Sequence, residues 1–436
     1  MKPYLAISCP ASSRSGYGDH SRDLIRSLIE MDLFEIHVID QMWGHCPQNA
    51  LESSDPIQNL IIKQNMPKQP DIWIQVTVPA EFQPIGKYNI GITAGIETTL
   101  ASPTWLEGCN KMHKVIVPSE HSKYVLQKSN FDKKDKQTQQ IIEKLQVTTS
   151  VEVLFEGLNL DVFKKTDIIE KDIKQTLDSI KEDFCFLVCG HWLNGVQGED
   201  RKDIGMTIKT FLETFKNKQP GKMPALVMKT SSATFSVTDR EDMLSRIEQI
   251  KQQVSNNGRL PNIYLIHGDL SEEQMNGLYN HKKVKAMISF TKGEGFGRPL
   301  LEFSNTGKPT IASNWSGQTD FLSAYGVSLP GKLLDVHPSV VWENTILKES
   351  QWFTVDYQFA SQILSDVYKN YKKHLQKTRK QTQYIKENFS LNEMTARFKE
   401  IMTGVIKDTQ SSLGQQPDDK SLAKTNQQLE ELQTYE

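Results

Sequence analysis

The sequence predicts an α/β protein with two doubly wound domains, each built on a parallel sheet. Its 436 residues exceed one ordinary core, because single domains usually contain roughly 100–200 residues. Short apolar runs alternate with amphipathic stretches through both halves of the chain, which is typical of consecutive βαβ units. A densely charged segment at residues 164–183 separates the halves, and we place the domain boundary within it, between residues 170 and 171.

The first half contains apolar runs that are expected to form strands, with an amphipathic helix at residues 24–31 between the first two. The strands are expected at residues 4–8, 34–39, 71–76, 88–93, 114–118 and 151–154. The charged, Gln-rich stretch at residues 130–144 is expected to be a surface excursion.

The second half repeats this alternation. Strands are expected at residues 184–190, 225–229, 263–267, 285–289 and 309–312, and helices at residues 204–215, 244–254 and 300–305. Two such halves would bind ligands in a cleft between them, at the carboxyl ends of the strands. The Gln-, Asp- and Lys-rich tail at residues 408–436 is expected to be disordered or loosely helical.

Composition and charge restrict the class of protein. Hydrophobic residues make up 37% of the chain and charged residues 24%, which indicates a globular protein, and the net charge of −2 excludes a strong overall attraction to DNA or anionic lipid. No apolar run approaches the roughly 18–20 residues of a membrane span, and the N-terminus lacks the apolar core of a signal peptide. The five cysteines are scattered and lack zinc spacing. We therefore expect free thiols, a reducing compartment and a cytoplasmic location.

The most informative segment, residues 285–322, joins a strand to a helix through the loop Gly-Glu-Gly-Phe-Gly at residues 293–297. Glycines allow the backbone to approach a ligand closely. At the start of the helix, the N–H groups of Arg298, Leu300 and Leu301 are expected to bind a diphosphate. Taken alone, the segment also fits an ordinary glycine turn before an amphipathic helix.

Glu294 in this loop and Glu302 in the helix are candidate ligands for a sugar and a ribose, because one carboxylate can accept hydrogen bonds from two hydroxyl groups. The two glutamates are separated by seven residues, and Gly-Lys-Pro-Thr-Ile-Ala-Ser at residues 307–313 and then Gly317 follow them. This complete pattern resembles the retaining glycosyltransferases of family 4, which have the GT-B fold.

The resemblance extends over about residues 4–400, because segments 115–126, 153–163, 262–279 and 389–398 fit the family in the same order. It implies two Rossmann-like domains that face a central cleft, with an acceptor domain at residues 1–170, a donor domain at residues 171–385 and a closing helix at residues 386–407. The implied reaction transfers a sugar from a nucleotide-sugar to an acceptor hydroxyl with retention of the anomeric configuration. It needs no obligatory metal or other cofactor, and the sequence contains no Asp-x-Asp motif for Mg²⁺.

Arg201 and Lys202 form a basic pair between the strand at residues 184–190 and the next helix. Such a pair can neutralise a departing diphosphate, although most long cationic side chains simply lie in solvent. The resembled family has a lysine here and usually an arginine directly after the strand. His191 and Trp192 occupy that second position, so we expect Arg201 to substitute for the arginine.

Four further residues are weaker candidates. Gly16 and Gly18 resemble the family's glycine loop beside the donor phosphates, although a plain strand–helix turn fits equally well. Glu97 stands near a place where many relatives have a histidine, and it is expected to orient or polarise the acceptor hydroxyl. Lys229 ends a strand and is expected to face the cleft. The predicted catalytic residues are therefore Glu294, Arg201, Lys202 and Glu97, and the predicted donor-binding residues are Gly16, Gly18, Lys229, Gly295, Phe296, Gly297, Arg298, Leu300, Leu301 and Glu302.

The acceptor stays open among glycan, lipid, protein and nucleic acid, and so does the oligomeric state. Residues 369–380 contain six basic residues and no acid. Such a run is usually a solvated helix face, but it can also contact phosphates of nucleic acid or lipid. The alternatives are a DNA-modifying glycosyltransferase that acts on hydroxylated bases and a non-catalytic GT-B protein that binds sugar nucleotides.

Overall fold

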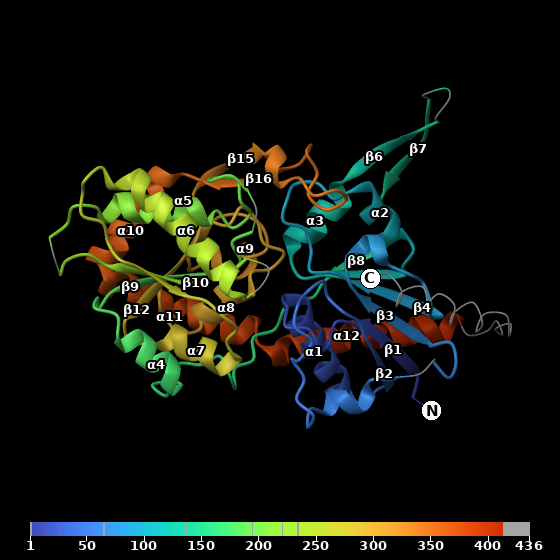
Figure 1. Ribbon diagram of the computed structural model, residues 1–436. Coiled ribbons are helices and arrows are strands. Elements are labelled where there is room, and N and C mark those ends of the chain that lie inside the picture. Colours follow the sequence, from blue (N-terminus) through green and yellow to red (C-terminus); the bar gives the residue numbers. More distant parts are fainter. Residues whose placement is uncertain are drawn as a thin grey trace. The chain divides into compact units, whose positions relative to one another are not determined.

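The computed structural model describes residues 2–63, 66–135, 138, 140–193, 195–219, 221–232 and 235–412 (Figure 1). Contacts divide these residues into two compact units, each with its own hydrophobic core. The first unit contains residues 2–95, 100–157 and 391–412, and the second contains Ile96–Thr99 and Leu158–Ser390.

A parallel sheet with strand order β2-β1-β3-β4-β5-β8 forms the centre of the first unit. Its strands are β1 (Tyr4–Cys9), β2 (Glu35–Asp40), β3 (Ile72–Val76), β4 (Tyr88–Ile92), β5 (Lys114–Val117) and β8 (Ser150–Val153). The helices of this unit are α1 (Gly16–Met31), α2 (Pro103–Asn110), α3 (Glu120–Lys128) and α12 (Leu391–Ser412). β1 is buried along its whole length and apolar except at Ser8, as expected for a parallel strand that is covered on both faces.

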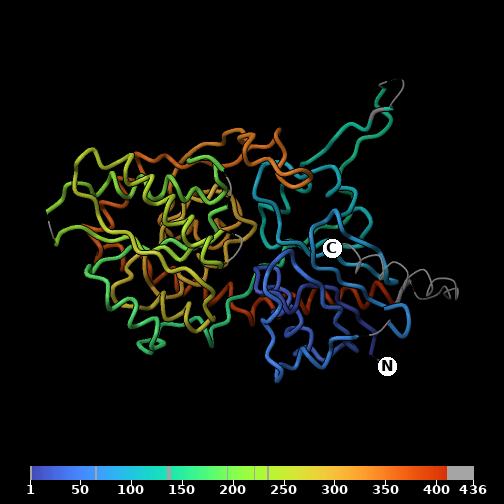
Figure 2. The backbone as a smooth tube through the Cα atoms, in the orientation of Figure 1, coloured from blue at the N-terminus to red at the C-terminus, as the bar shows by residue number. Residues whose placement is uncertain are grey.

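The C-terminal helix α12 returns to the first unit and packs against α1, and the red and blue helices lie side by side in Figures 1 and 2. Ser27 Oγ on α1 and Thr395 Oγ1 on α12 are 2.7 Å apart. α12 continues to Ser412 and buries Thr409 in its last turns, so the first residues of the segment expected to be disordered or loosely helical are helical. The rest of that predicted tail, residues 413–436, lies outside the described residues.

The second unit is built on a parallel sheet with strand order β11-β10-β9-β12-β13-β14. Its strands are β9 (Cys185–Cys189), β10 (Ala225–Lys229), β11 (Ile263–Ile266), β12 (Val284–Ser289), β13 (Thr310–Ser313) and β14 (Val327–Leu329). Its helices are α4 (Lys171–Asp178), α5 (Ile204–Phe215), α6 (Val237–Ser255), α7 (Glu272–Asn280), α8 (Arg298–Ser304), α9 (Thr319–Leu322), α10 (Tyr357–Lys369) and α11 (Tyr371–Asn388). Figure 1 shows α5, α6 and α10 on one face of the sheet and α7, α8 and α11 on the other.

Two antiparallel strand pairs lie outside the main sheets. β6 (Asn130–Lys134) and β7 (Ile141–Gln146) form a hairpin in the first unit, at the predicted surface excursion. In the second unit, β15 (Gly331–Asp335) pairs with β16 (Gln351–Val355). This second pair was not predicted, because β15 is exposed along its length and shows no apolar alternation.

The contacts divide the chain between Gly157 and Leu158, earlier than the boundary predicted at residue 170. The intervening segment bonds to the second unit, since the Thr166 N–H donates to Asn280 Oδ1 at 3.2 Å. The boundary was not predicted at Gly157, because the composition of the chain changes only later, at the charged stretch of residues 164–183.

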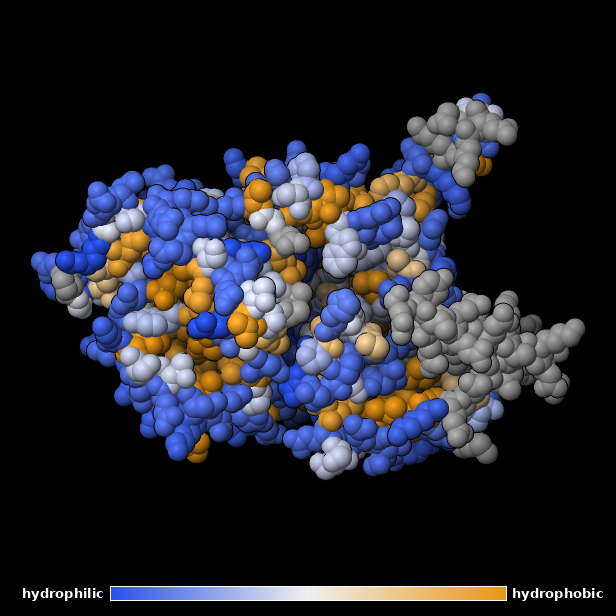
Figure 3. All heavy atoms as spheres, in the orientation of Figure 1, coloured by the Kyte–Doolittle hydropathy of each residue, from blue (hydrophilic) through white to orange (hydrophobic). Residues whose placement is uncertain are grey.

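The surface and the cysteines agree with the composition. Figure 3 shows hydrophilic side chains over most of the face that it draws. The five cysteines are unpaired. Within the described part of the chain, no helix is both long enough and apolar enough to cross a membrane.

Candidate functional site

The basic pair and the glycine-rich loop follow two neighbouring strands of the second sheet. From β9 the chain proceeds through β10 and β11 on one side, and from β12 through β13 and β14 on the other. Open α/β sheets bind ligands where the strand order reverses in this way, at the carboxyl ends of the strands. The loop after β9 carries Arg201 and Lys202, and the loop after β12 carries Glu294. The fold therefore brings the two predicted motifs to one edge.

The Lys202 ammonium forms an ion pair with the Glu294 carboxylate, and their side chains are 18% and 11% exposed. Burial alone would raise the pKa of Glu294, but Lys202 and Arg201 outweigh it and hold the pKa below its ordinary value. The backbone is fixed as well. The Glu294 N–H donates to Ser316 Oγ at 2.8 Å, and its carbonyl accepts from the Gly317 N–H at 2.9 Å. Glu294 is thus a firmly held carboxylate that is ionised at neutral pH.

Glu97 lies beside this pair and binds the Arg201 guanidinium. It belongs to the second unit with the short segment Ile96–Thr99, although β4 before it belongs to the first unit. Burial, together with the Glu294 carboxylate, raises the pKa of Glu97 above its ordinary value despite the two cations. The structure places Glu97 at the site, and its role toward an acceptor hydroxyl stays a prediction.

Two glycines allow the loop to pass Glu97 and enter α8. A Cβ on Gly293 would lie 1.9 Å from the backbone oxygen of Glu97, so a side chain does not fit there. Gly297 has a φ of 100°, in the left-handed region that side chains rarely adopt. The close approach that we predicted toward a ligand is made, at Gly293, toward the protein's own backbone.

Glu302 lies on α8, as predicted, and is 8% exposed. The Tyr279 hydroxyl donates to Glu302 Oε2 at 3.0 Å, and Arg298 Nε donates to Oε1 at 3.2 Å. Burial, with the Glu302 charge added to it, raises the pKa of Tyr279 well above its ordinary value, so this hydroxyl stays a donor. The sequence did not predict Tyr279 as a site residue, because a hydrogen bond between α7 and α8 leaves no pattern in either segment.

Diphosphate binding by the N–H groups of Leu300 and Leu301 at the start of α8 stays a prediction, and both groups have a partner within the helix. The N–H groups of Leu300 and Leu301 donate to the Gly297 carbonyl at 2.9 and 3.3 Å, because the chain closes its first helical turn there. They are not open donors in this structure.

Donor binding by Phe296 and Lys229 stays a prediction, and the structure shows what each side chain contacts. Phe296 is 2% exposed and packs against Phe321 with ring centroids 5.2 Å apart, so it anchors the loop to the core. Lys229 ends β10, and its Nζ lies 5.4 Å from the centroid of the Phe235 ring. Lys229 is thus one strand away from the Lys202–Glu294 pair.

Gly16 and Gly18 belong to the first unit and form part of the first turn of α1, not a loop before it. Ser15 caps this helix, since its side chain accepts from the Gly18 N–H at 3.1 Å. A Cβ on Gly18 would lie 2.1 Å from the Ser13 carbonyl oxygen. The tight packing of this turn explains Gly18 without a ligand, and donor binding there stays a prediction.

His191 stands where the resembled family has an arginine. Its Nδ1 lies 2.9 Å from the Ser232 carbonyl oxygen. Burial lowers the pKa of His191, and the cations Lys202 and Arg201 lower it further. The imidazole is therefore neutral at pH 7, and Arg201 and Lys202 supply the positive charge at this edge.

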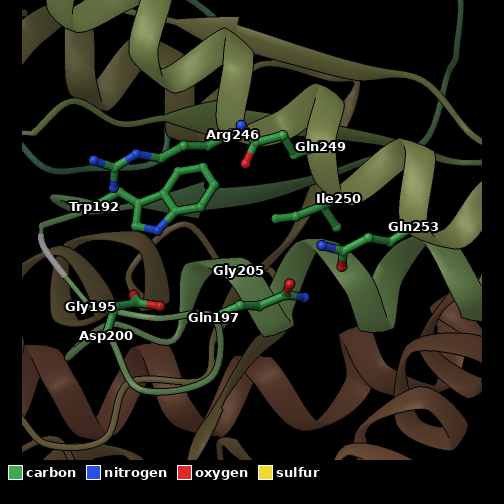
Figure 4. A pocket seen from close by; sticks show the side chains of 9 residues that line it. All are labelled: Trp192, Gly195, Gln197, Asp200, Gly205, Arg246, Gln249, Ile250 and Gln253. Atoms are coloured by element: carbon green, nitrogen blue, oxygen red, sulfur yellow. The ribbon is translucent and has the colours of Figure 1, made fainter. Parts of the chain in front are cut away.

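A cavity of about 290 Å³ lies between the loop after β9 and helices α5 and α6 (Figure 4). Its lining residues are Trp192, Gly195, Gln197, Asp200, Gly205, Arg246, Gln249, Ile250 and Gln253. Asp200 is 1% exposed, and its Oδ2 accepts from the Ile204 N–H at 3.0 Å. Asp200 therefore fixes the loop at the residue before the basic pair.

No protein-family model matches the chain, and no curated protein matches its sequence. Solved structures match its fold. A glycosyltransferase from Rickettsia africae ESF-5 is 14% identical with a TM-score of 0.59, over 93% of this chain and 99% of that one. Sucrose-phosphate synthase from Thermosynechococcus elongatus is 12% identical with a TM-score of 0.60, over 94% and 100%. Anabaena HepE, solved in complex with UDP-glucose, is 13% identical with a TM-score of 0.57, over 92% and 100%.

The chain has the GT-B fold. The predicted fold class is therefore confirmed, and at these identities the comparison shows the fold alone. Within the described ranges, no group of three or more His, Cys, Asp or Glu residues is arranged to hold a metal ion. The expectation that the GT-B protein works without a metal stays a prediction.

Proposed function

We propose that this GT-B protein is a glycosyltransferase that moves a sugar from a nucleotide-sugar donor to an acceptor hydroxyl, with retention at the anomeric carbon. One observation carries the proposal. Two cations and two carboxylates, paired as Arg201–Glu97 and Lys202–Glu294, are gathered at the point where the strand order of the second sheet reverses. Because desolvating such pairs is costly, a site that handles charged substrate explains them better than stability does.

The ion pairs provide a route by which a donor prepares the site. A bound diphosphate attracts the Lys202 ammonium, because a diphosphate carries more negative charge than one carboxylate. The oxygens of Glu294 then become acceptors for hydroxyl groups of the sugar. When the sugar–phosphate bond breaks, negative charge grows on the diphosphate, and Lys202 and Arg201 stabilise it.

Glu97 and Glu302 complete the proposed division of roles. Glu97 has a raised pKa and is paired with Arg201, which suits a group that exchanges a proton with an acceptor hydroxyl once Arg201 has turned to phosphate. Glu302 is already held by Tyr279 and Arg298, which suits a fixed acceptor for ribose hydroxyl groups.

The first experiment measures thermal stabilisation by UDP-, GDP- and ADP-sugars, and UDP-glucose is tested first because HepE binds it. A donor at a hundredfold its Kd should stabilise the fold by about 2.7 kcal/mol, which raises the Tm measurably. The same donor should be hydrolysed slowly without an acceptor, and the anomeric configuration of the released or transferred sugar reports retention. Stabilisation without any turnover would indicate a non-catalytic binding protein, and no stabilisation by any donor would contradict the proposal.

A second candidate function, transfer to a polyanionic acceptor such as DNA with hydroxylated bases, is favoured by one surface. Helix α11 buries His374, Thr378, Gln381 and Ile385 and exposes five cations, which are Lys372, Lys373, Lys377, Arg379 and Lys380. The sequence of α11 contains no acid before Glu387, so this helix contributes only positive charge to the surface, and Asp366 of α10 is the carboxylate beside it, 2.7 Å from His374.

If this face binds a polyanion, the rate of transfer to it should fall at least about 100-fold between roughly 50 and 200 mM salt, because several phosphate contacts release counterions. Initial rates against salt, measured for a nucleic acid and for a neutral glycan, check this. A Lys373→Glu, Lys377→Glu double variant should flatten the slope for the nucleic acid and leave the glycan rate unchanged. A flat wild-type profile for every acceptor would assign the helix face to solvent.

A further inference from the structure

A second, buried ion pair adjoins the Lys202–Glu294 pair in both segments. Asp203 directly follows Lys202, and Lys292 precedes Glu294 by two residues. Asp203 Oδ2 and Lys292 Nζ are 3.8 Å apart, and their side chains are 0% and 1% exposed. Neither group can reach a ligand from solvent. Because hydrophobic residues of similar volume often replace such pairs without loss of stability, stability alone is a poor explanation for this one.

Residues from β16 and the start of α10 surround this pair. Lys292 Nζ donates to Thr354 Oγ1 at 2.8 Å and lies 5.9 Å from the centroid of the Trp352 ring. The Tyr357 hydroxyl donates to Asp203 Oδ2 at 2.6 Å. The two charges are therefore held at fixed places inside the second unit.

The pair also connects the two loops of the candidate site. The Lys292 N–H donates to the Arg201 carbonyl at 2.9 Å, which joins the loops by backbone as well. Asp203 has a φ of 51°, a left-handed conformation that aspartate tolerates better than most residues. It does not cap α5 with its side chain, because Asp200 accepts from the Ile204 N–H instead. The Asp203 carboxylate is thus directed to Lys292 and Tyr357.

We propose that Asp203 and Lys292 are positioning residues, whose ion pair holds the turn that carries Lys202 against the loop that carries Glu294. The inference rests on the proposed function, and it names the contact that sets the position of Lys202 relative to Glu294. The pair touches no substrate and acts through Lys202. A displacement of about 1 Å at a positioned group can cost on the order of 100-fold in rate, so small rearrangements of this turn matter.

The surroundings of Asp203 make this contact sensitive to pH. Burial raises the pKa of Asp203 to about 7, Lys292 and the Tyr357 hydroxyl act in the opposite direction, and Asp200 and Glu199 add to the rise. Above this pH the carboxylate is ionised and pairs with Lys292, and below it the pairing is lost. Wild-type turnover should therefore fall as the pH drops through about 7.

The test measures kcat and KM for donor turnover between about pH 6 and 8.5, around the titration of Asp203. Asp203→Asn should lower kcat at least tenfold at the upper end, change KM for the donor less than threefold, and lose the inflection. Tyr357→Phe removes a hydrogen bond that favours the ionised form, so its inflection should move to higher pH. Tyr371→Phe is the matched control, since it removes a hydroxyl that donates to the Lys285 carbonyl at 3.0 Å in the same unit. It should leave kcat and the pH profile unchanged.

Stability supplies a readout that is independent of turnover. The folded protein binds the Asp203 proton more tightly than the unfolded chain does, because the pKa is about 7 against an ordinary 3.8. The stability from this group is complete below the ordinary pKa and is lost as the pH rises through about 7. The Tm of wild type relative to Asp203→Asn should therefore increase as the pH falls, opposite to turnover.

The outcomes separate this inference from the proposed function. If wild type turns a donor over, and Asp203→Asn and Tyr357→Phe both keep its kcat and pH profile, the positioning role is wrong and the proposed function stands. If wild type turns over no donor, the proposed function is wrong and the positioning role falls with it. If Asp203→Asn fails to fold, the shift of the inflection in Tyr357→Phe decides.

Discussion

Lys202→Ala should lower turnover about 100- to 1000-fold, the effect typical of losing one group that stabilises developing charge in a transition state. Donor affinity should fall much less. Lys202 already has a partner in Glu294 before the donor binds, so the ground state exchanges one contact for another. The transition state has no such compensation, because negative charge grows on the diphosphate. Single-turnover rates and donor Kd values, measured on the same preparation, separate the two effects.

The matched control for this variant is Lys209→Ala, which removes a lysine from α5, the helix that follows the basic pair. It should behave like wild type in both measurements. The Tm of Lys202→Ala has to be measured as well, because the substitution leaves Glu294 buried without its main counter-charge. A folded Lys202→Ala protein with wild-type turnover would refute the assignment of this lysine.

Glu302→Ala should weaken binding of both the free nucleoside diphosphate and the sugar-bearing donor, whereas Glu294→Ala should weaken only the donor and lower its turnover. The reason is their placement. Glu302 lies on α8 and is held by Tyr279, whereas Glu294 lies in the preceding loop and becomes open to a sugar when Lys202 moves to phosphate. Losing one charged hydrogen-bond partner costs on the order of 1.5–3 kcal/mol, or roughly ten- to a hundredfold in affinity.

Calorimetry of both variants with both ligands gives the four affinities that are needed. Glu294→Gln and Glu302→Gln serve as controls for shape, because each keeps one carbonyl acceptor and should lose less than the alanine variant. Equal weakening of the sugar-free nucleotide by Glu294→Ala and Glu302→Ala would show that the donor is placed wrongly.

The sheets could be predicted because buried parallel strands have short, continuous apolar sequences, such as Cys185–Cys189. The start of α1 could not be located from residue patterns alone. Ser15 caps the helix, but Gly16 and Gly18 follow it, and glycine has a poor helix propensity. The strand β15 has no buried face and therefore no pattern to detect.

The candidate site also contains residues that the sequence predicted and contacts that it did not. Glu294 and Glu302 were found because glycines and a proline next to them are local signals for a loop and a helix start. The partners of these residues depend on tertiary contacts between distant segments, and no spacing rule connects Glu97 to Arg201 or Asp203 to Lys292. Lys292 lies three residues beyond the end of the apolar strand β12, and sequence patterns give such a residue no partner.

The chain leaves the first unit after Gly157 and returns to it at Leu391, and the neighbouring residues Leu158 and Ser390 pair as a short β-bridge. Most of the second unit, residues 158–390, is thus an insertion between two segments of the first unit. A recombinant fragment of residues 158–390 would be one continuous polypeptide that retains Arg201, Lys202, Glu294 and Glu302. The fragment would lack Glu97, because Ile96–Thr99 lies between two segments of the first unit in the sequence. Arg201 would then keep its charge without that carboxylate. An exchange of this domain between proteins of the same architecture would therefore have to include Ile96–Thr99 together with residues 158–390.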